Sequence, residues 1–211
     1  MVRFITFEGG DGSGKSTQIR ALENYLVHRG YSCVVTREPG GTALGKLIRK
    51  MLLEVGGQEI ASSTELFMYL ADRAHHVKEV ILPAIEAGKV VLCDRFTDST
   101  MAYQGFGRGI ELRLLRQVND LATQELRPDL TFLFDCPANV GLARTARREK
   151  ETGSHKEDRF EREKMEFHGK VRNGFLEMAR AEPQRFRIVN ATLSIEEVTL
   201  AMKNIIDQEL C

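Results

Sequence analysis

Short apolar runs alternate with longer stretches of helical periodicity along the whole chain of 211 residues. The short runs are rich in β-branched and aromatic residues and are apolar throughout, which is typical of strands covered on both faces. We expect strands over residues 2–8, 31–36, 89–93, 130–135 and 185–189. The helical spacing predicts helices over residues 14–29, 42–54, 63–87, 110–125, 137–150, 160–181 and 194–208. Strands that alternate with helices imply a parallel, doubly wound sheet and the α/β class.

Local signals mark several ends of these helices. Gly30 and Gly88 follow helical segments and are expected as C-terminal glycines. Ser63 and Ser194 precede helical segments and are expected to cap their N-termini.

One segment, residues 149–158, is polar and charged and has no apolar periodicity. We expect it to be exposed and mobile. Arginines flank it at Arg144, Arg147, Arg148 and Arg159. It is either an ordinary solvated connection or a lid that closes positive charge over phosphates.

Residues 9–16 carry the strongest chemical signal, Gly-Gly-Asp-Gly-Ser-Gly-Lys-Ser, which matches G-x-x-x-x-G-K-[ST]. Such a loop cradles phosphates with backbone N–H groups, while Lys15 reaches the outer phosphates and the Ser16 hydroxyl holds Mg²⁺. A glycine-rich turn could match by chance, but the strand-like run before it and the helix-like run after it supply the required context. The residues assigned to the triphosphate are Gly9, Gly10, Asp11, Gly12, Ser13, Gly14, Lys15, Ser16 and Thr17.

The strand over 89–93 runs directly into Asp94 and Arg95. Ligands of open α/β sheets bind at the carboxyl ends of the strands, where this pair is expected to lie. Asp94 suits a role in the Mg²⁺ shell or beside Lys15, and Arg95 can clamp a phosphate with its planar fork. A plain salt pair at a strand end is the alternative.

Three further segments offer ligand-binding groups. Residues 37–41, Arg-Glu-Pro-Gly-Gly, form a turn after the second strand and carry charged side chains to the same edge. Tyr69 and Arg73 share a helix face at spacing i, i+4 and could hold a base and a phosphate, although core packing would explain the ring equally well. In residues 99–105, Gln104 has both a donor and an acceptor for a base edge, but a turn of polar caps would look similar.

The amino-acid composition limits the kinds of binding partner that we expect. Lys and Arg together number 30, as do Asp and Glu, so the balance of charge indicates neither a nucleic-acid footprint nor a membrane surface. We expect one domain over residues 1–211, in the cytoplasm, without a signal peptide or membrane span. Cys33, Cys93 and Cys136 are expected as buried, reduced thiols.

Taken together, segments 7–16, 37–41, 94–96 and 102–105 resemble those of bacterial thymidylate kinases, in order and spacing, over nearly the whole chain. The resemblance implies a P-loop kinase fold with a five-stranded parallel sheet and a mobile lid over about 144–159. It also implies a homodimer that transfers the γ-phosphoryl group of ATP to dTMP, giving dTDP and ADP for dTTP biosynthesis, with Mg²⁺ as cofactor.

The resemblance further implies a base site, in which Tyr69 stacks on thymine while Thr100 and Gln104 hydrogen-bond its edge. Tyr103 would lie against the sugar and Asp11 near its 3′-hydroxyl. The full set of expected acceptor residues is Glu38, Arg49, Tyr69, Arg73, Arg95, Ser99, Thr100, Tyr103 and Gln104.

Charge on the phosphates would be met by arginines. Arg49, Arg73 and Arg95 would hold the monophosphate. Members of the family keep a catalytic arginine either in the phosphate loop or in the lid, and none of residues 10–13 is basic. The lid therefore supplies it, with Arg148 as first choice and Arg147 as second, while Arg144 faces the adenine or the ATP phosphates.

Two other functions remain open at this level. A phosphate loop also serves nucleotide-driven switches, but no Asn-Lys-x-Asp motif is present, and a basic lid suits a second phosphorylated substrate better. A kinase acting on another monophosphate or on a deoxynucleoside would carry the same donor site.

Overall fold

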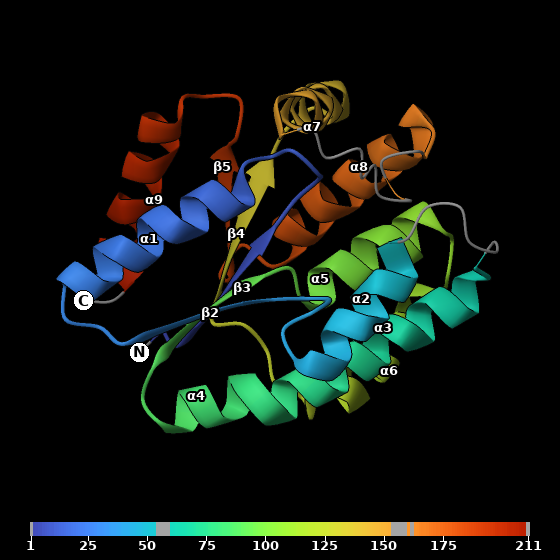
Figure 1. Cartoon of the computed structure of the whole chain (residues 1–211), viewed down its shortest axis with the longest axis horizontal. Coiled ribbons are helices and arrows are strands. Elements are labelled where there is room, and N and C mark those ends of the chain that lie inside the picture. Colours follow the sequence, from blue (N-terminus) through green and yellow to red (C-terminus); the bar gives the residue numbers. More distant parts are fainter. Residues whose placement is uncertain (1, 54–59, 153–159, 161–162, 210–211) are drawn as a thin grey trace.

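The computed structural model describes residues 2–53, 60–152, 160 and 163–209 (Figure 1). At its centre five parallel strands lie in the order β2-β3-β1-β4-β5. This arrangement confirms the doubly wound α/β prediction, and each observed strand lies within two residues of its predicted range. The strands are β1 (Phe4–Glu8), β2 (Cys33–Arg37), β3 (Val90–Asp94), β4 (Leu130–Asp135) and β5 (Phe186–Asn190).

Helices cover both faces of this sheet (Figure 1). On one face lie α1 (Lys15–His28) and α9 (Ile195–Glu209), which pack against each other. The other face carries α8 (Met165–Ala181) and a long helical run made of α3 (Ser62–His76), η1 (Val77–Ile81) and α4 (Leu82–Glu86). The remaining helices are α2 (Ala43–Leu53), α5 (Thr97–Thr100), η2 (Met101–Gly107), α6 (Leu112–Thr123) and α7 (Ala138–Thr152).

The core is split by the sheet, because alternate residues of a strand point to opposite faces. In β1, Ile5 and Phe7 join the cluster under α1 and α9, whereas Phe4 joins the cluster under η1 and α4. In β4, Phe132 faces the first side and Leu133 contacts α8 on the other. Burial on both faces explains the apolar character of the three inner strands β1, β3 and β4, whereas the edge strands β2 and β5 are partly exposed.

The predicted helix ends are largely observed. Gly30 and Gly88 adopt positive φ angles of 85° and 76° just beyond their helices. Ser194 caps α9, since its hydroxyl accepts the Glu197 N–H while the Glu197 carboxylate accepts the Ser194 N–H. The prediction for Ser63 was wrong: α3 begins one residue earlier, after Ala61, and has no side-chain cap.

Three segments differ from expectation. The helix predicted over 137–150 is α7, which continues through Glu151 and Thr152 of the segment expected to be irregular; residues 153–158 and Arg159 lie outside the described part of the chain. The helix predicted over 160–181 is α8, which begins at Met165, and Phe160 instead packs edge-on against Tyr103. Residues 97–107 are helical, as α5 and the π-helical η2. The sequence alone allowed either a ligand-binding segment or a turn of polar caps at residues 99–105.

Cys93 and Cys136 are buried free thiols, and Cys33 is a partly buried one. The thiol prediction is confirmed for the first two and only partly for Cys33. Among the described residues, no helix has the length and apolar character needed to span a bilayer.

Candidate active site

The phosphate loop joins the end of β1 to the first residue of α1. Gly9, Gly12 and Gly14 adopt φ angles of 135°, 69° and 92°, a region that favours glycine. A side chain on Gly12 would also collide with the backbone oxygen of Gly141 at the start of α7. The backbone path therefore favours glycine at these three positions of the motif, and the loop leaves the N-terminus of α1 open to an anion.

Lys15 folds back over the loop. Its Nζ donates to the carbonyl oxygens of Gly9 at 3.0 Å and Gly10 at 2.9 Å, and to Ser13 Oγ at 3.3 Å. Burial, together with the nearby positive charge of Arg95, lowers the pKa of Lys15 to about 8. A bound phosphate would replace these carbonyl contacts with an ionic one.

Ser16 and Asp94 meet across the site, although they are far apart in sequence. Ser16 Oγ donates to Asp94 Oδ2 at 3.3 Å. The other oxygen, Asp94 Oδ1, is buried, and no donor among the described residues reaches it. Mg²⁺ is usually held by one or two protein oxygens plus waters and substrate phosphates. An unsatisfied carboxylate oxygen beside a hydroxyl fits that requirement.

Arg95 occupies the centre of the site, with an unusual backbone φ of 69°. Its guanidinium donates to Asp11 Oδ1 at 2.6 Å, to the Gly9 carbonyl at 3.0 Å and to Ser99 Oγ at 3.1 Å. Asp11 Oδ2 accepts the Tyr103 hydroxyl at 3.2 Å. Burial tends to raise the pKa of Asp11, but Arg95 and Lys15 outweigh it and hold that pKa below its usual range.

Glu8, the last residue of β1, fixes the turn that carries Arg95. Its carboxylate accepts the Phe96 N–H at 2.7 Å and the Ser99 hydroxyl at 2.6 Å. Burial and the neighbouring Asp98 raise the pKa of Glu8 to about 7. The sequence prediction missed this residue, although a charged residue ending an apolar strand beside a phosphate loop was the available signal.

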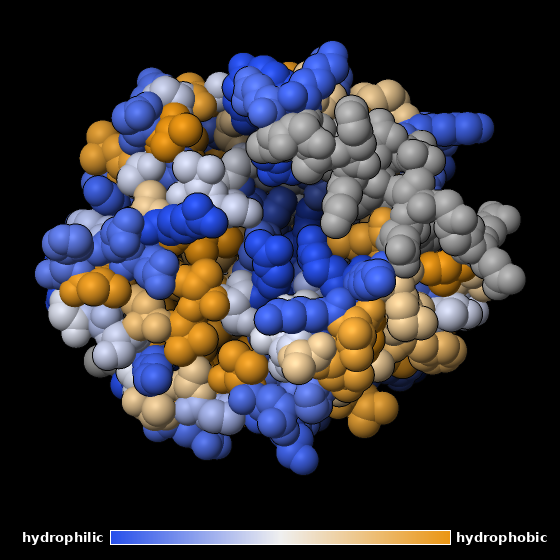
Figure 2. Space-filling view, viewed as in Figure 1, coloured by the Kyte–Doolittle hydropathy of each residue, from blue (hydrophilic) through white to orange (hydrophobic). Residues whose placement is uncertain are grey.

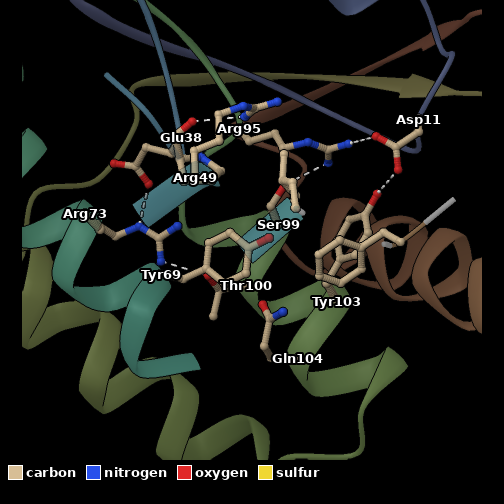
Figure 3. A pocket seen from close by; sticks show the side chains of 13 residues that line it. Asp11, Glu38, Arg49, Tyr69, Arg73, Arg95, Ser99, Thr100, Tyr103 and Gln104 are labelled. Atoms are coloured by element: carbon tan, nitrogen blue, oxygen red, sulfur yellow. Dashed lines mark hydrogen bonds and ion pairs between the residues drawn. The ribbon is translucent and has the colours of Figure 1, made fainter. Parts of the chain in front are cut away.

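A pocket with an empty volume of about 530 Å³ opens beside this centre (Figure 3). Arg49, Arg95 and Asp11 lie at one end in this view, while Tyr69, Thr100 and Gln104 lie at the other. All predicted acceptor residues line it, so the fold brings together the loops after β2 and β3 with α2, α3, α5 and η2. Its lining is Asp11, Glu38, Pro39, Arg49, Leu53, Tyr69, Arg73, Arg95, Ser99, Thr100, Tyr103, Gln104 and Phe160.

Arg73 differs from the other arginines, because it is almost fully buried and its guanidinium is engaged by protein groups. It donates to Glu38 Oε2 at 2.7 Å, Thr100 Oγ1 at 2.8 Å, Asn119 Oδ1 at 2.7 Å and the Phe96 carbonyl at 2.9 Å. In Figure 3 it lies beside Glu38 and Thr100. The geometry thus associates Arg73 with Thr100 rather than with Arg49 and Arg95.

A second, more polar cavity with an empty volume of about 860 Å³ runs along the phosphate loop. Figure 2 shows a hollow rimmed by hydrophilic side chains on this face of the molecule. The cavity is lined by Asp11, Gly12, Ser13, Gly14, Lys15, Ser16, Thr17, Arg37, Glu38, Arg49, Asp94, Arg95, Thr145 and Arg148. It shares Asp11, Glu38, Arg49 and Arg95 with the first pocket, so the two sites adjoin at these four residues.

The three candidate lid arginines lie on α7 but have different surroundings. Arg148 lines the phosphate-loop cavity. Arg147 is largely exposed and pairs with Glu151 one helical turn away, at 3.5 Å. Arg144 donates to the Ala191 carbonyl at 2.7 Å, beyond the end of β5. Of the three, Arg148 is the one that lines the phosphate-loop cavity.

Two residues at the pocket carried no sequence signal: Phe160, which lines it, and Asn119, which binds Arg73. Phe160 lies 6.5 Å from the Tyr69 ring and 5.5 Å from the Tyr103 ring, centroid to centroid. Asn119, on α6, accepts a hydrogen bond from Arg73 across 46 positions of the chain. Nothing in local periodicity distinguishes these residues from ordinary core positions.

Comparison with known proteins places this site in a family. A family model described as thymidylate kinase matches residues 7–201. The chain is 51% identical over 208 residues to a thymidylate kinase of Desulfovibrio desulfuricans, covering 98% of this chain and 96% of that protein. It is 49% identical over 203 residues to one of Geobacter sulfurreducens, covering 96% and 95% of the two chains.

A solved structure agrees with these relatives. The crystal structure of a thymidylate kinase from Ehrlichia chaffeensis superposes with a TM-score of 0.77 at 36% identity, covering 97% of this chain and 98% of that one. The family model and the relatives span nearly the whole chain and so include both pockets. The chain belongs to the thymidylate kinase family.

Proposed function

We propose that this protein transfers the γ-phosphoryl group of ATP to dTMP, yielding dTDP and ADP for dTTP synthesis. One observation carries the proposal beyond family membership: a phosphate-loop cavity and a base-sized pocket adjoin at Asp11, Glu38, Arg49 and Arg95. A donor in one and a monophosphate in the other would have their phosphates at this junction. Such placement is the main requirement of phosphoryl transfer.

The donor side is built by the phosphate loop. The backbone N–H groups at the start of α1 and the positive end of that helix would hold the β- and γ-phosphates. Lys15 would leave its carbonyl partners and pair with them. Arg144, bound to the carbonyl of Ala191, is proposed to border the adenine end of ATP.

Mg²⁺ fits this site, with Ser16 and Asp94 as the residues that would hold it. The buried, unsatisfied Asp94 Oδ1 supports the assignment. When bound, the ion supplies positive charge that offsets the charge of the phosphate oxygens.

On the acceptor side we propose a base end and a phosphate end. Tyr69 offers a ring face to thymine, and Thr100 and Gln104 offer hydrogen-bonding groups to its edge. Arg49 and Arg95 would hold the monophosphate. Arg73 bonds to Thr100 Oγ1, so we now assign it to the base end rather than to the phosphate.

Transfer itself needs no general base, because the attacking oxygen of the dTMP phosphate is already anionic. That oxygen forms the new bond to the γ-phosphorus as the bond to the β,γ-bridging oxygen of ATP breaks, and ADP leaves with the electron pair. Lys15, Arg95 and Arg148 would stabilise the charge that the transferred group spreads over its oxygens. Asp11 and Tyr103 would face the sugar of the acceptor.

We further propose that the protein acts as a homodimer in the cytoplasm. Leu47, Met51 and Phe67 on α2 and α3 are 64%, 62% and 64% exposed, respectively. Figure 2 shows apolar surface over these helices on the face in view. An apolar patch of neighbouring helices suits a self-complementary interface about a twofold axis.

The deciding experiment is a coupled ADP-release assay with dTMP, dUMP, dCMP, AMP, GMP and thymidine as acceptors. We expect ADP release to depend on an added monophosphate, with dTMP giving the highest kcat/KM. Release of phosphate from ATP at the same rate without any acceptor would indicate a nucleotide-driven switch. Preference for another acceptor would overturn the assignment of dTMP.

A further inference from the structure

The side-chain amide of Gln104 is held in one orientation by a buried carboxylate. Gln104 Nε2 donates to Glu65 Oε1 at 2.8 Å, and Glu65 is fully buried. A carboxylate accepts hydrogen bonds but donates none, so it binds the NH₂ side of the amide. Gln104 also lines the acceptor pocket. One N–H of the Gln104 amide is bound to Glu65, and in this orientation the carbonyl oxygen lies toward Tyr69 and Thr100 in Figure 3, so it is the group that Gln104 offers to a ligand there.

Glu65 is itself held in place by Arg108, at the end of η2. The Arg108 guanidinium approaches both oxygens of Glu65, at 3.4 Å each, and donates to Glu163 Oε1 at 2.6 Å. It also lies over the ring of Phe167, 4.7 Å from the centroid. The buried charge of Glu65 therefore has a fixed counter-ion, as a buried carboxylate requires.

We propose that Glu65 is a positioning residue for base selection, acting through Gln104. By holding the amide NH₂, Glu65 makes Gln104 an acceptor toward the pocket. The proposal rests on the function proposed above and adds how the pocket distinguishes pyrimidines.

The orientation of the Gln104 amide matters for base selection, because pyrimidine bases differ at ring position 3. Thymine and uracil carry an N–H at ring position 3, which a carbonyl oxygen accepts. Cytosine has a lone pair there, and two acceptors facing each other leave both unpaired. Sites that read a base through a buried polar group discriminate strongly against an analogue that cannot complete the bond.

The change Glu65→Gln tests this role, because a glutamine can either donate or accept and no longer fixes the Gln104 amide. We expect the ratio of kcat/KM for dTMP to that for dCMP to fall by about tenfold or more. The ratio for dTMP to dUMP should not change, because both bases carry the same ring N–H. If Glu65 only stabilised the fold, Glu65→Gln would change both kcat/KM ratios together.

The double variant shows whether the effect passes through Gln104. Gln104→Leu should lower the dTMP to dCMP ratio by itself, and adding Glu65→Gln to it should lower the ratio no further. Glu79→Gln, an exposed carboxylate in the same helical run, is the matched control and should leave both ratios at wild-type values.

Three results would overturn the proposal: an unchanged dTMP to dCMP ratio in Glu65→Gln, equal changes in both ratios, or a further fall in the double variant. If Glu65→Gln does not fold, Glu65→Asp shortens the reach to Gln104, and a wild-type ratio there overturns the proposal equally. A wild-type protein that does not prefer dTMP would instead refute the proposed function.

Discussion

The guanidinium of Arg95 and the carboxylate of Asp11 are joined at 2.6 Å, where the phosphate-loop cavity and the acceptor pocket adjoin. The bond links a loop residue of the donor site to the turn after β3. Tyr103 holds the other oxygen of Asp11, so the carboxylate is oriented from both sides. A group fixed in this way can act on an acceptor without first being ordered.

Replacement of Arg95 tests the phosphate end of the acceptor site. We expect Arg95→Ala to lower kcat/KM for dTMP by about 10²- to 10³-fold, the usual effect of removing one preorganised donor from a site where charge develops. Arg95→Lys should recover little, because an ammonium cannot replace a planar fork that reaches several acceptors. Steady-state kinetics check this, with the exposed Arg127→Ala as control. An Arg95→Ala enzyme of wild-type efficiency would refute the assignment.

Arg148 and Arg147 provide a matched pair on the same helix. Because Arg148 lines the cavity and Arg147 pairs with Glu151 in solvent, we expect Arg148→Ala to slow chemistry by roughly 10³-fold. Arg147→Ala should stay within about threefold of wild type, as exposed pairs contribute little. Single-turnover measurements with saturating ATP separate this step from product release. Equal rates for the two variants would refute the assignment of Arg148 as the catalytic arginine.

Nucleotide affinity should weaken at alkaline pH. Burial and Arg95 lower the pKa of Lys15 to about 8 in the unliganded protein, whereas bound phosphates favour its charged form. Above that pH the free protein loses the proton that the complex retains, so Kd for ATP should rise by up to about tenfold per pH unit. Titrations with ATP between pH 7 and 9.5 check this. Lys15→Ala should bind weakly and with no such rise, and a flat wild-type profile would contradict the prediction.

Asp72 is a buried carboxylate whose ionisation should destabilise the protein. Its Oδ1 accepts the Gly40 N–H at 3.1 Å, but within the described residues no donor reaches its buried Oδ2. Burial and the neighbouring Glu38 raise the pKa of Asp72 from 3.8 to about 6. A carboxyl with a raised native pKa contributes stability below its unfolded pKa, and this contribution is lost as the pH rises through the native value.

The variant Asp72→Asn keeps the oxygen that binds Gly40 and cannot ionise. Its stability relative to wild type should therefore increase between pH 4 and pH 8, by roughly 2 kcal/mol. Urea unfolding of both proteins at several pH values measures this difference. A difference that is independent of pH would show that Asp72 does not titrate in this range.

The proposed dimer surface can be tested on α3. Phe67→Asp places a charge in the apolar patch of Leu47, Met51 and Phe67, and we expect it to convert a dimer into a monomer in light-scattering chromatography. Leu200→Asp is the control, because Leu200 is similarly exposed, at 61%, on α9. Wild-type protein that is monomeric at micromolar concentration would refute the dimer.

The sequence by itself determined the elements whose pattern is local. Strands buried on both faces must be apolar throughout, so β1, β3 and β4 were found within two residues. The phosphate loop was equally clear, because its backbone path favours glycine at Gly9, Gly12 and Gly14. Asp94 and Arg95 followed from the rule that parallel strands end at one edge of the sheet.

Only the tertiary structure decided which groups face one another inside the site. Whether Arg73 meets a phosphate or Thr100 depends on contacts among α3, the loop after β2, α5 and α6, and helical spacing carries no such information. The orientation of Gln104 is set by Glu65, 39 positions earlier in the chain. Local periodicity fixes which side of an element is buried, whereas the partner of a buried polar group is chosen by the packing of distant segments.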